Sequence, residues 1–142
     1  MASKILTTHV GSLPRSKQLS ELLFSKDKKE SYDEKEFKEI VKQNVEEVVK
    51  KQLNIGIDFI SDGEMSKISY ATYVKDRISG FSGESERKTP ADLEDFPEYM
   101  TKIAKSGGTP SYTRPCCTSD LAIQDTESLK DDVANLNNAI KK

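Results

Sequence analysis

One long amphipathic segment constrains the fold of this chain more than any other feature. From about Asp33 to Leu53, apolar side chains recur at spacings of three, four and eight residues, which predicts a helix with one buried face. Asp33 can cap its first turn, with Glu36 placed as in a capping box, and Gly56 ends it. We interpret the stripe as core packing; it consists of Phe37, Ile40, Val41, Val45, Val48, Val49 and Leu53.

Two short β-prone segments flank this helix. Residues 4–10 are rich in β-branched side chains and end at the turn Gly11-Ser12, and a short apolar run from Ile57 follows Gly56. Between the first segment and the long helix, Leu19 and the apolar residues 22–24 predict a short helix, and the charge run 26–30 predicts a solvated loop. A strand, a helical crossover and a second strand are typical of an α/β protein with parallel strands and a right-handed connection.

The remainder of the chain has a looser pattern. It predicts short helices over residues 68–79 and 97–105, a polar excursion loop over 82–95 and extended chain over 111–124. A last helix is expected from about Thr126, with Leu129, Val133, Leu136 and Ile140 on one face. That face should lead into another strand, and a closed α/β barrel takes about 250 residues. We therefore expect residues 1–142 to form a single domain that represents the first two to three β/α units of an incomplete barrel.

Composition excludes several classes of protein. The 142 residues include 22 basic and 24 acidic side chains, so the net charge of −2 gives no basic surface for nucleic acid. The apolar runs are too short for a membrane span, and no signal peptide is recognisable, so a cytoplasmic location is expected. Cys116 and Cys117 are adjacent, which suits neither a disulfide framework nor a chelate. We expect one of these thiols to be buried and the other exposed.

The polar residues that follow the two predicted strands are the candidates for chemistry. Gly11 and Ser12 can present a backbone N–H and a hydroxyl to a carboxylate, and Glu64 after the second strand can hold an ammonium. Together these groups suit the two ends of an amino acid. The same residue types are also common in turns that have no binding role, and this alternative stays open. Asp62 is interpreted as a hydrogen-bonding group at the strand end, and Asp58 as a residue at the strand start.

The order of four sequence motifs resembles the catalytic barrel of the cobalamin-independent methionine synthase family. These motifs are Thr7-Thr-His-Val-Gly-Ser-Leu-Pro-Arg15, Gly56-Ile-Asp-Phe-Ile-Ser-Asp-Gly-Glu64, the segment 67–81 and Tyr112-Thr-Arg-Pro115. The resemblance implies a TIM-type (β/α)8 barrel and a methyltransferase. Such an enzyme transfers a methyl group from methyltetrahydrofolate to the thiol of homocysteine with zinc and without cobalamin.

The resemblance also implies roles for individual residues. Ser12 and Glu64, with Gly11, would bind the amino-acid end of homocysteine, and Arg114 would lie near folate. His9 and Asp62 could line the pocket. The zinc ligands of the family, a His-x-Cys pair, a glutamate and a distant cysteine, belong to later strands, so we expect neither catalytic residues nor metal ligands here. An improvised zinc site would have to draw on His9, Cys116, Cys117 and carboxylates such as Glu64.

Two departures from the family leave the reaction partners open. Pro115 stands where these enzymes usually carry cysteine, and Met65-Ser66-Lys67 replaces a version that contains arginine. One alternative is alkyl transfer to another thiol such as coenzyme M, which has a sulfonate and no amino group. The other alternative is a non-catalytic module that associates with itself, because a partial barrel exposes strand edges and apolar helix faces. In that case we expect a homo-oligomer.

Overall fold

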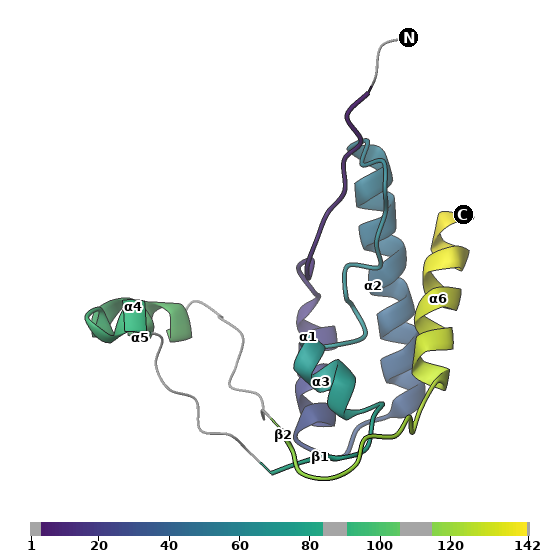
Figure 1. Cartoon of the computed structure of the whole chain (residues 1–142). Helices are drawn as coiled ribbons and strands as arrows, with labels where there is room; N and C mark the ends of the chain where they lie inside the picture. Colours follow the sequence, from purple (N-terminus) through teal and green to yellow (C-terminus); the bar gives the residue numbers. More distant parts are fainter. Residues whose placement is uncertain (1–3, 84–90, 106–114, 142) are drawn as a thin grey trace.

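The computed structural model describes residues 4–83, 91–105 and 115–141 (Figure 1). Helices dominate, and the named strands are two residues long. In chain order the elements are α1 (Lys17–Asp27), α2 (Glu34–Asn54), α3 (Tyr70–Lys75), β1 (Phe81–Ser82), α4 (Ala91–Glu94), α5 (Pro97–Lys105), β2 (Cys116–Cys117) and α6 (Glu127–Ile140).

The long helix α2 organises the core, as its apolar stripe predicts, except at Leu53, which is 50% exposed near the end of the helix. The Asp33 side chain accepts hydrogen bonds from the backbone N–H groups of Lys35 and Glu36, which confirms the predicted cap. In Figure 1 α2 stands between α1 and α6, and it packs against both. The buried apolar side chains come from these helices and from the segment after Glu64; they are Leu19, Leu23, Phe37, Val41, Val45, Val48, Val49, Met65, Ile68 and Ala139.

The parallel register of the two predicted strands is confirmed at one point. Thr8 and Phe59 form an isolated parallel bridge, and the backbone N–H groups of Asp58 and Phe59 both donate to the carbonyl of Thr7. The ladder does not extend further in the described residues, because side chains bind the neighbouring backbone groups instead. The Asp58 carboxylate accepts from the Thr7 N–H at 2.9 Å, and the Thr8 hydroxyl donates to the Phe59 carbonyl at 3.0 Å.

The charge run 26–30 was predicted to be a solvated loop, and this prediction was wrong for its first two residues. Helix α1 continues through Asp27. The Asp27 side chain is only 6% exposed and forms an ion pair with Lys75, the last residue of α3, while the Lys26 ammonium lies 5.0 Å from the centre of the Phe37 ring. Lys26 and Asp27 therefore contact residues of α2 and α3 and are not simply solvated.

The second half of the chain contains an antiparallel pair in place of a further parallel strand. β1 pairs with β2, with Phe81 opposite Cys117 and Ser82 opposite Cys116. Both thiols are exposed, so the expectation of one buried cysteine was wrong: this two-residue strand lies at the surface on both faces. The predicted loop 82–95 contains α4, which contacts α5 away from the main helices (Figure 1); residues 84–90 lie outside the described part.

Polar side chains accept hydrogen bonds from the first turns of helices α3 and α6. Ser69 and Thr72 form a reciprocal capping box, and α3 ends at Lys75, earlier than the predicted segment 68–79. At α6 the capping side chain is Asp125, which accepts from the backbone N–H groups of Glu127 and Ser128 and from the Ser128 hydroxyl. These hydrogen bonds lower the pKa of Asp125, because they favour its ionised form.

Candidate functional site

The two polar turns identified in the sequence lie next to each other. The first, Gly11–Arg15, follows the segment of Thr8, and the second, Ser61–Glu64, follows the segment of Phe59, so the parallel bridge brings both to the same end. The backbone N–H of Leu13 donates to the carbonyl of Gly63 at 3.0 Å and joins the turns directly. This is the edge at which parallel α/β sheets place ligands, where the carboxyl ends of strands meet.

Ser12 and Glu64 form the centre of this site. The Ser12 hydroxyl donates to Oε2 of Glu64 at 2.6 Å, a short hydrogen bond of the kind that carboxylates accept from hydroxyl groups. Ser12 is exposed and Glu64 is half-buried. The backbone N–H groups of Gly11 and Ser12 have no hydrogen-bond partner within the described part of the chain. The site thus offers donors for an anion beside a carboxylate that attracts a cation.

Arg15 fixes the relative position of the two turns. Its Nη2 atom donates to Ser12 Oγ at 3.2 Å, to the carbonyl of Glu64 at 3.0 Å and to the carbonyl of Lys67 at 2.6 Å. Burial lowers the pKa of Arg15, an effect that the neighbouring Glu64 carboxylate partly offsets. The sequence pattern predicted a role for Ser12 and none for Arg15, although both residues stand in the same motif.

The backbone of Glu64 is held in a conformation that few residues adopt. Its φ angle is +57°, in the left-handed region, directly after Gly63 at +64°. For a residue with a Cβ this geometry costs on the order of 1 kcal/mol or more. The Asp62 carboxylate accepts from the Glu64 N–H at 2.9 Å, and Arg15 binds the Glu64 carbonyl at 3.0 Å. These contacts impose the conformation, and they show that Asp62 acts as the predicted hydrogen-bonding group at the strand end.

Gln52, on the buried face of α2, binds the backbone at the start of the second turn. Its side chain is 3% exposed; Oε1 accepts from the Ser61 N–H at 3.1 Å, and Nε2 donates to the Ser61 carbonyl at 2.8 Å. Because Gln52 binds both backbone groups of Ser61, it fixes the start of the turn that carries Glu64. A polar residue at a core position of a helical stripe is the sequence signal that could have identified it.

Three further candidate residues from the sequence are His9, Asp58 and Arg114. His9, two residues before Gly11, is half-buried, and its Nε2 atom is buried without a hydrogen-bond partner in the described residues. Asp58 binds Lys4 and Thr7, and these hydrogen bonds lower its pKa, so it stabilises the strand start away from the site. Arg114 lies outside the described residues.

The described residues do not provide a site for a metal ion. Within residues 4–83, 91–105 and 115–141, no three His, Cys, Asp or Glu side chains gather closely enough to hold one. A zinc ion that activates a thiol takes about three protein ligands. The improvised site considered above is therefore not assembled in this part of the chain.

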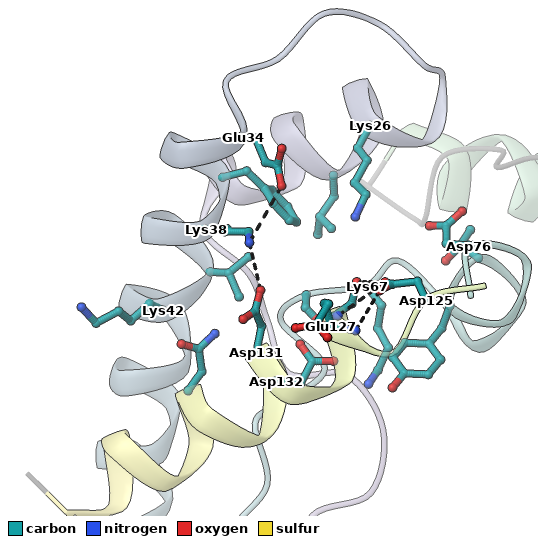
Figure 2. A pocket seen from close by; sticks show the side chains of 18 of the residues that line it. Lys26, Glu34, Lys38, Lys42, Lys67, Asp76, Asp125, Glu127, Asp131 and Asp132 are labelled. Carbon is teal, nitrogen blue, oxygen red and sulfur yellow. Dashed lines mark hydrogen bonds and ion pairs between the residues drawn. The ribbon is translucent and has the colours of Figure 1, made fainter. Parts of the chain in front are cut away.

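A cavity of about 550 Å³ lies apart from Ser12 and Glu64, among α1, α2, α3 and α6 (Figure 2). Its charged lining residues are largely engaged with one another: Lys38 approaches Glu34 at 3.9 Å and Asp131 at 3.1 Å. Arg77 binds Asp132 at 3.4 Å at the same cavity, where burial raises the pKa of Asp132. The Lys38–Asp131 pair joins α2 to α6, and the Arg77–Asp132 pair joins the turn after α3 to α6, so periodicity within one helix could not have shown the cavity.

Comparison with known protein families shows the family to which the chain belongs. The model of the family "Cobalamin-independent synthase, Catalytic domain" matches residues 5–95, which include both turns, α1 and α2. The chain belongs to this family of methyltransferase type. The match ends before α5, β2 and α6. No curated protein matched the chain, and in the described residues no helix is long and apolar enough to cross a membrane.

Proposed function

We propose that this chain binds the amino-acid end of a thiol substrate, homocysteine, for a methionine-synthase-like methyltransferase. The observation that carries the proposal is the pairing of Ser12 and Glu64 at 2.6 Å across two turns that are joined by a parallel bridge. The Glu64 carboxylate would accept from the substrate ammonium. The backbone N–H groups of Gly11 and Ser12 would bind the carboxylate of the substrate.

These residues orient the substrate and take no part in breaking or forming its bonds. Two charged ends fixed at neighbouring turns leave the side chain of the amino acid, with its thiol, to point away from the turns. Holding a reactant in one orientation lowers the barrier of a transfer reaction. The family resemblance adds methyltetrahydrofolate as the methyl donor and zinc as the group that activates the thiol. We derive no step through zinc, because the described residues do not form its site.

An acceptor with a sulfonate and no amino group, such as coenzyme M, fits the site less well. The Glu64 carboxylate, hydrogen-bonded to Ser12 at 2.6 Å, would repel a sulfonate bound at the same place. A ligand without an ammonium would leave the Glu64 carboxylate without a role in binding. The carboxylate therefore favours an amino acid over this alternative.

Glu64→Gln should weaken homocysteine binding by about 30-fold, because a hydrogen bond to a charged group contributes about 2 kcal/mol. The substitution keeps the shape of the side chain and removes its charge. Binding is measured by NMR titration of the full chain with L-homocysteine under reducing conditions. Glu47→Gln serves as the matched control, since Glu47 is exposed on α2 and pairs with Lys51. Equal affinity in the Glu64 and Glu47 variants would exclude Glu64 as the ammonium ligand.

A second candidate role, self-association, rests on the exposed strand edge. Ile5 and Val10 are 89% and 84% exposed, and Phe59 on the paired segment is 59% exposed. Apolar side chains at an open edge favour pairing with another chain. This role is compatible with substrate binding, because it uses the edge and not the turns.

We expect the full chain to be at least a dimer in multi-angle light scattering, and Val10→Lys to shift it toward the monomer. A charge at an open strand edge opposes edge-to-edge pairing. Glu30→Gln, at an exposed position after α1, is the control, because it raises the net charge by the same single unit. A monomer at all concentrations for the unmodified chain would contradict the self-associating role.

A further inference from the structure

The cavity among α1, α2, α3 and α6 has the properties of a small-molecule site. Its volume of about 550 Å³ is typical of ligand pockets, whose walls are mostly apolar with a few polar groups. The buried side chains of Leu23, Phe37 and Val41 line it, together with that of Ile68. Among its described lining residues none comes from the two polar turns, so the cavity is separate from the proposed amino-acid site.

The carboxylates around this cavity already have cationic or hydrogen-bonding partners. Asp125 accepts hydrogen bonds at the start of α6. Asp76, exposed after α3, has neighbouring cations in Lys26 and Lys75. The others form ion pairs: Asp27 with Lys75, Glu34 and Asp131 with Lys38, Glu39 with Lys42, Asp132 with Arg77 and Glu127 with Lys130. These carboxylates therefore leave little unbalanced negative charge for a cationic ligand.

Two lysines at the cavity lack a close ion pair. Among the described residues no carboxylate lies within 4.0 Å of the ammonium of Lys26, in the last turn of α1, or of Lys67, before α3. Their ammonium groups lie over aromatic rings instead, 5.0 Å from the centre of Phe37 and 4.5 Å from the centre of Tyr73. These contacts leave N–H donors unused, so both groups can still donate to a ligand. Both side chains line the cavity (Figure 2).

From this arrangement we infer that the cavity binds an organic anion with one acid group and an apolar body. The acid group accepts hydrogen bonds from Lys26 and Lys67, and the apolar body packs against Phe37 and the buried side chains beside it. Asp76 disfavours a second acid group, because its carboxylate lies close enough to interact with Lys26. The inference uses no residue of the proposed amino-acid site and is independent of the proposed function.

Three naphthalene compounds that differ in charge test this preference. Naphthoate is an anion at neutral pH, naphthamide is neutral and naphthylmethylamine is a cation, and all three are substituted at the same ring position. Each is titrated into the full chain and followed by NMR. Naphthoate should bind about tenfold more tightly than naphthamide, because hydrogen bonds between charged groups add to the same apolar contact. Naphthylmethylamine should bind most weakly.

Replacement of each lysine separates the effect of charge from that of cavity shape. Lys26→Met and Lys67→Met keep a long side chain and remove the ammonium, so each should weaken naphthoate binding by about tenfold. Binding of naphthamide should change little, whereas a distorted cavity would weaken both compounds alike. Lys50→Met, at an exposed position of α2 outside the cavity lining, is the matched control. The amide spectrum of each variant reports whether the fold is retained.

The amide signals that shift during the titration identify where naphthoate binds. Signals of Ile68, Thr72 and Asn135, which line the cavity, should move. Shifts confined to Ser12 and Glu64 would show that the acid binds at the polar turns, which would overturn this inference and leave the proposed function in place. Equal affinities for the three compounds, no binding of naphthoate, or lysine variants that bind it as tightly as the control would overturn the inference as well.

Discussion

Gln52→Leu should lower the free energy of unfolding by about 3 kcal/mol, since it leaves two backbone groups without partners at a cost of about 1–3 kcal/mol each. Gln52 is 3% exposed and binds both the N–H and the carbonyl of Ser61, and Nε2 also donates to the Val48 carbonyl at 3.1 Å. Leucine has a similar size and no polar atoms, so the loss reflects hydrogen bonding and not a cavity. The measurement is urea unfolding followed by circular dichroism.

Gln18→Leu is the matched control for this experiment. Gln18 is exposed on α1 and donates to Glu36 at 2.8 Å, so the change should stay within about 0.5 kcal/mol. Gln52→Leu should also weaken homocysteine binding, because the Ser61 turn carries Glu64. A loss of stability no larger than that of Gln18→Leu would show that Ser61 finds other partners and that Gln52 does not hold the turn.

Gly80→Ala should lower the free energy of unfolding by about 3 kcal/mol, through backbone strain and a collision with neighbouring backbone. The φ angle of Gly80 is +89°, and a Cβ there would lie 2.6 Å from the carbonyl oxygen of Ser119 and 2.7 Å from that of Asp120. The Gly80 carbonyl also accepts from the Thr118 N–H at 2.7 Å. The connection after β2 would have to move away, and its hydrogen bonds to Gly80 would be lost.

Gly83→Ala provides the comparison, measured by the same urea unfolding. Its φ angle is +69°, and a Cβ there would meet no atom within 4 Å. This variant should therefore show backbone strain alone, about 1 kcal/mol. The difference between the two variants measures the close approach at Gly80. Equal decreases in the free energy of unfolding would mean that the turn after β2 moves away at no energetic cost. Only the φ angle of the glycine would then matter.

Helices could be predicted well because their signals are local. Spacing of apolar residues located α2 and α6, and the Asp33 cap was readable from its position before the stripe. The strands were harder, because side chains such as those of Thr8 and Asp58 bind the backbone groups that a ladder needs. Threonine counts as a β-prone residue in the sequence, but its hydroxyl can occupy a backbone group that a neighbouring strand would otherwise bind.

The candidate site was predicted in part. Ser12 and Glu64 were selected as the two ends of an amino-acid site, and they are in contact. Arg15 was missed because its three partners lie in two turns, and only the folded chain brings them together. Gln52 and Asn44 were missed although both interrupt the apolar stripe of α2 at buried positions. Both side chains bind backbone carbonyl groups, which is why polar residues occupy these buried positions.

The parallel bridge between Thr8 and Phe59 has a consequence for the order of folding. The residues it joins are separated by both α1 and α2, so its formation must close a long segment of chain. Contacts of this kind slow folding, whereas helices form from local contacts in microseconds. We therefore expect α1 and α2 to pair first and the two polar turns to meet last. A ligand added during refolding would then report the final step, after the helical signal is already complete.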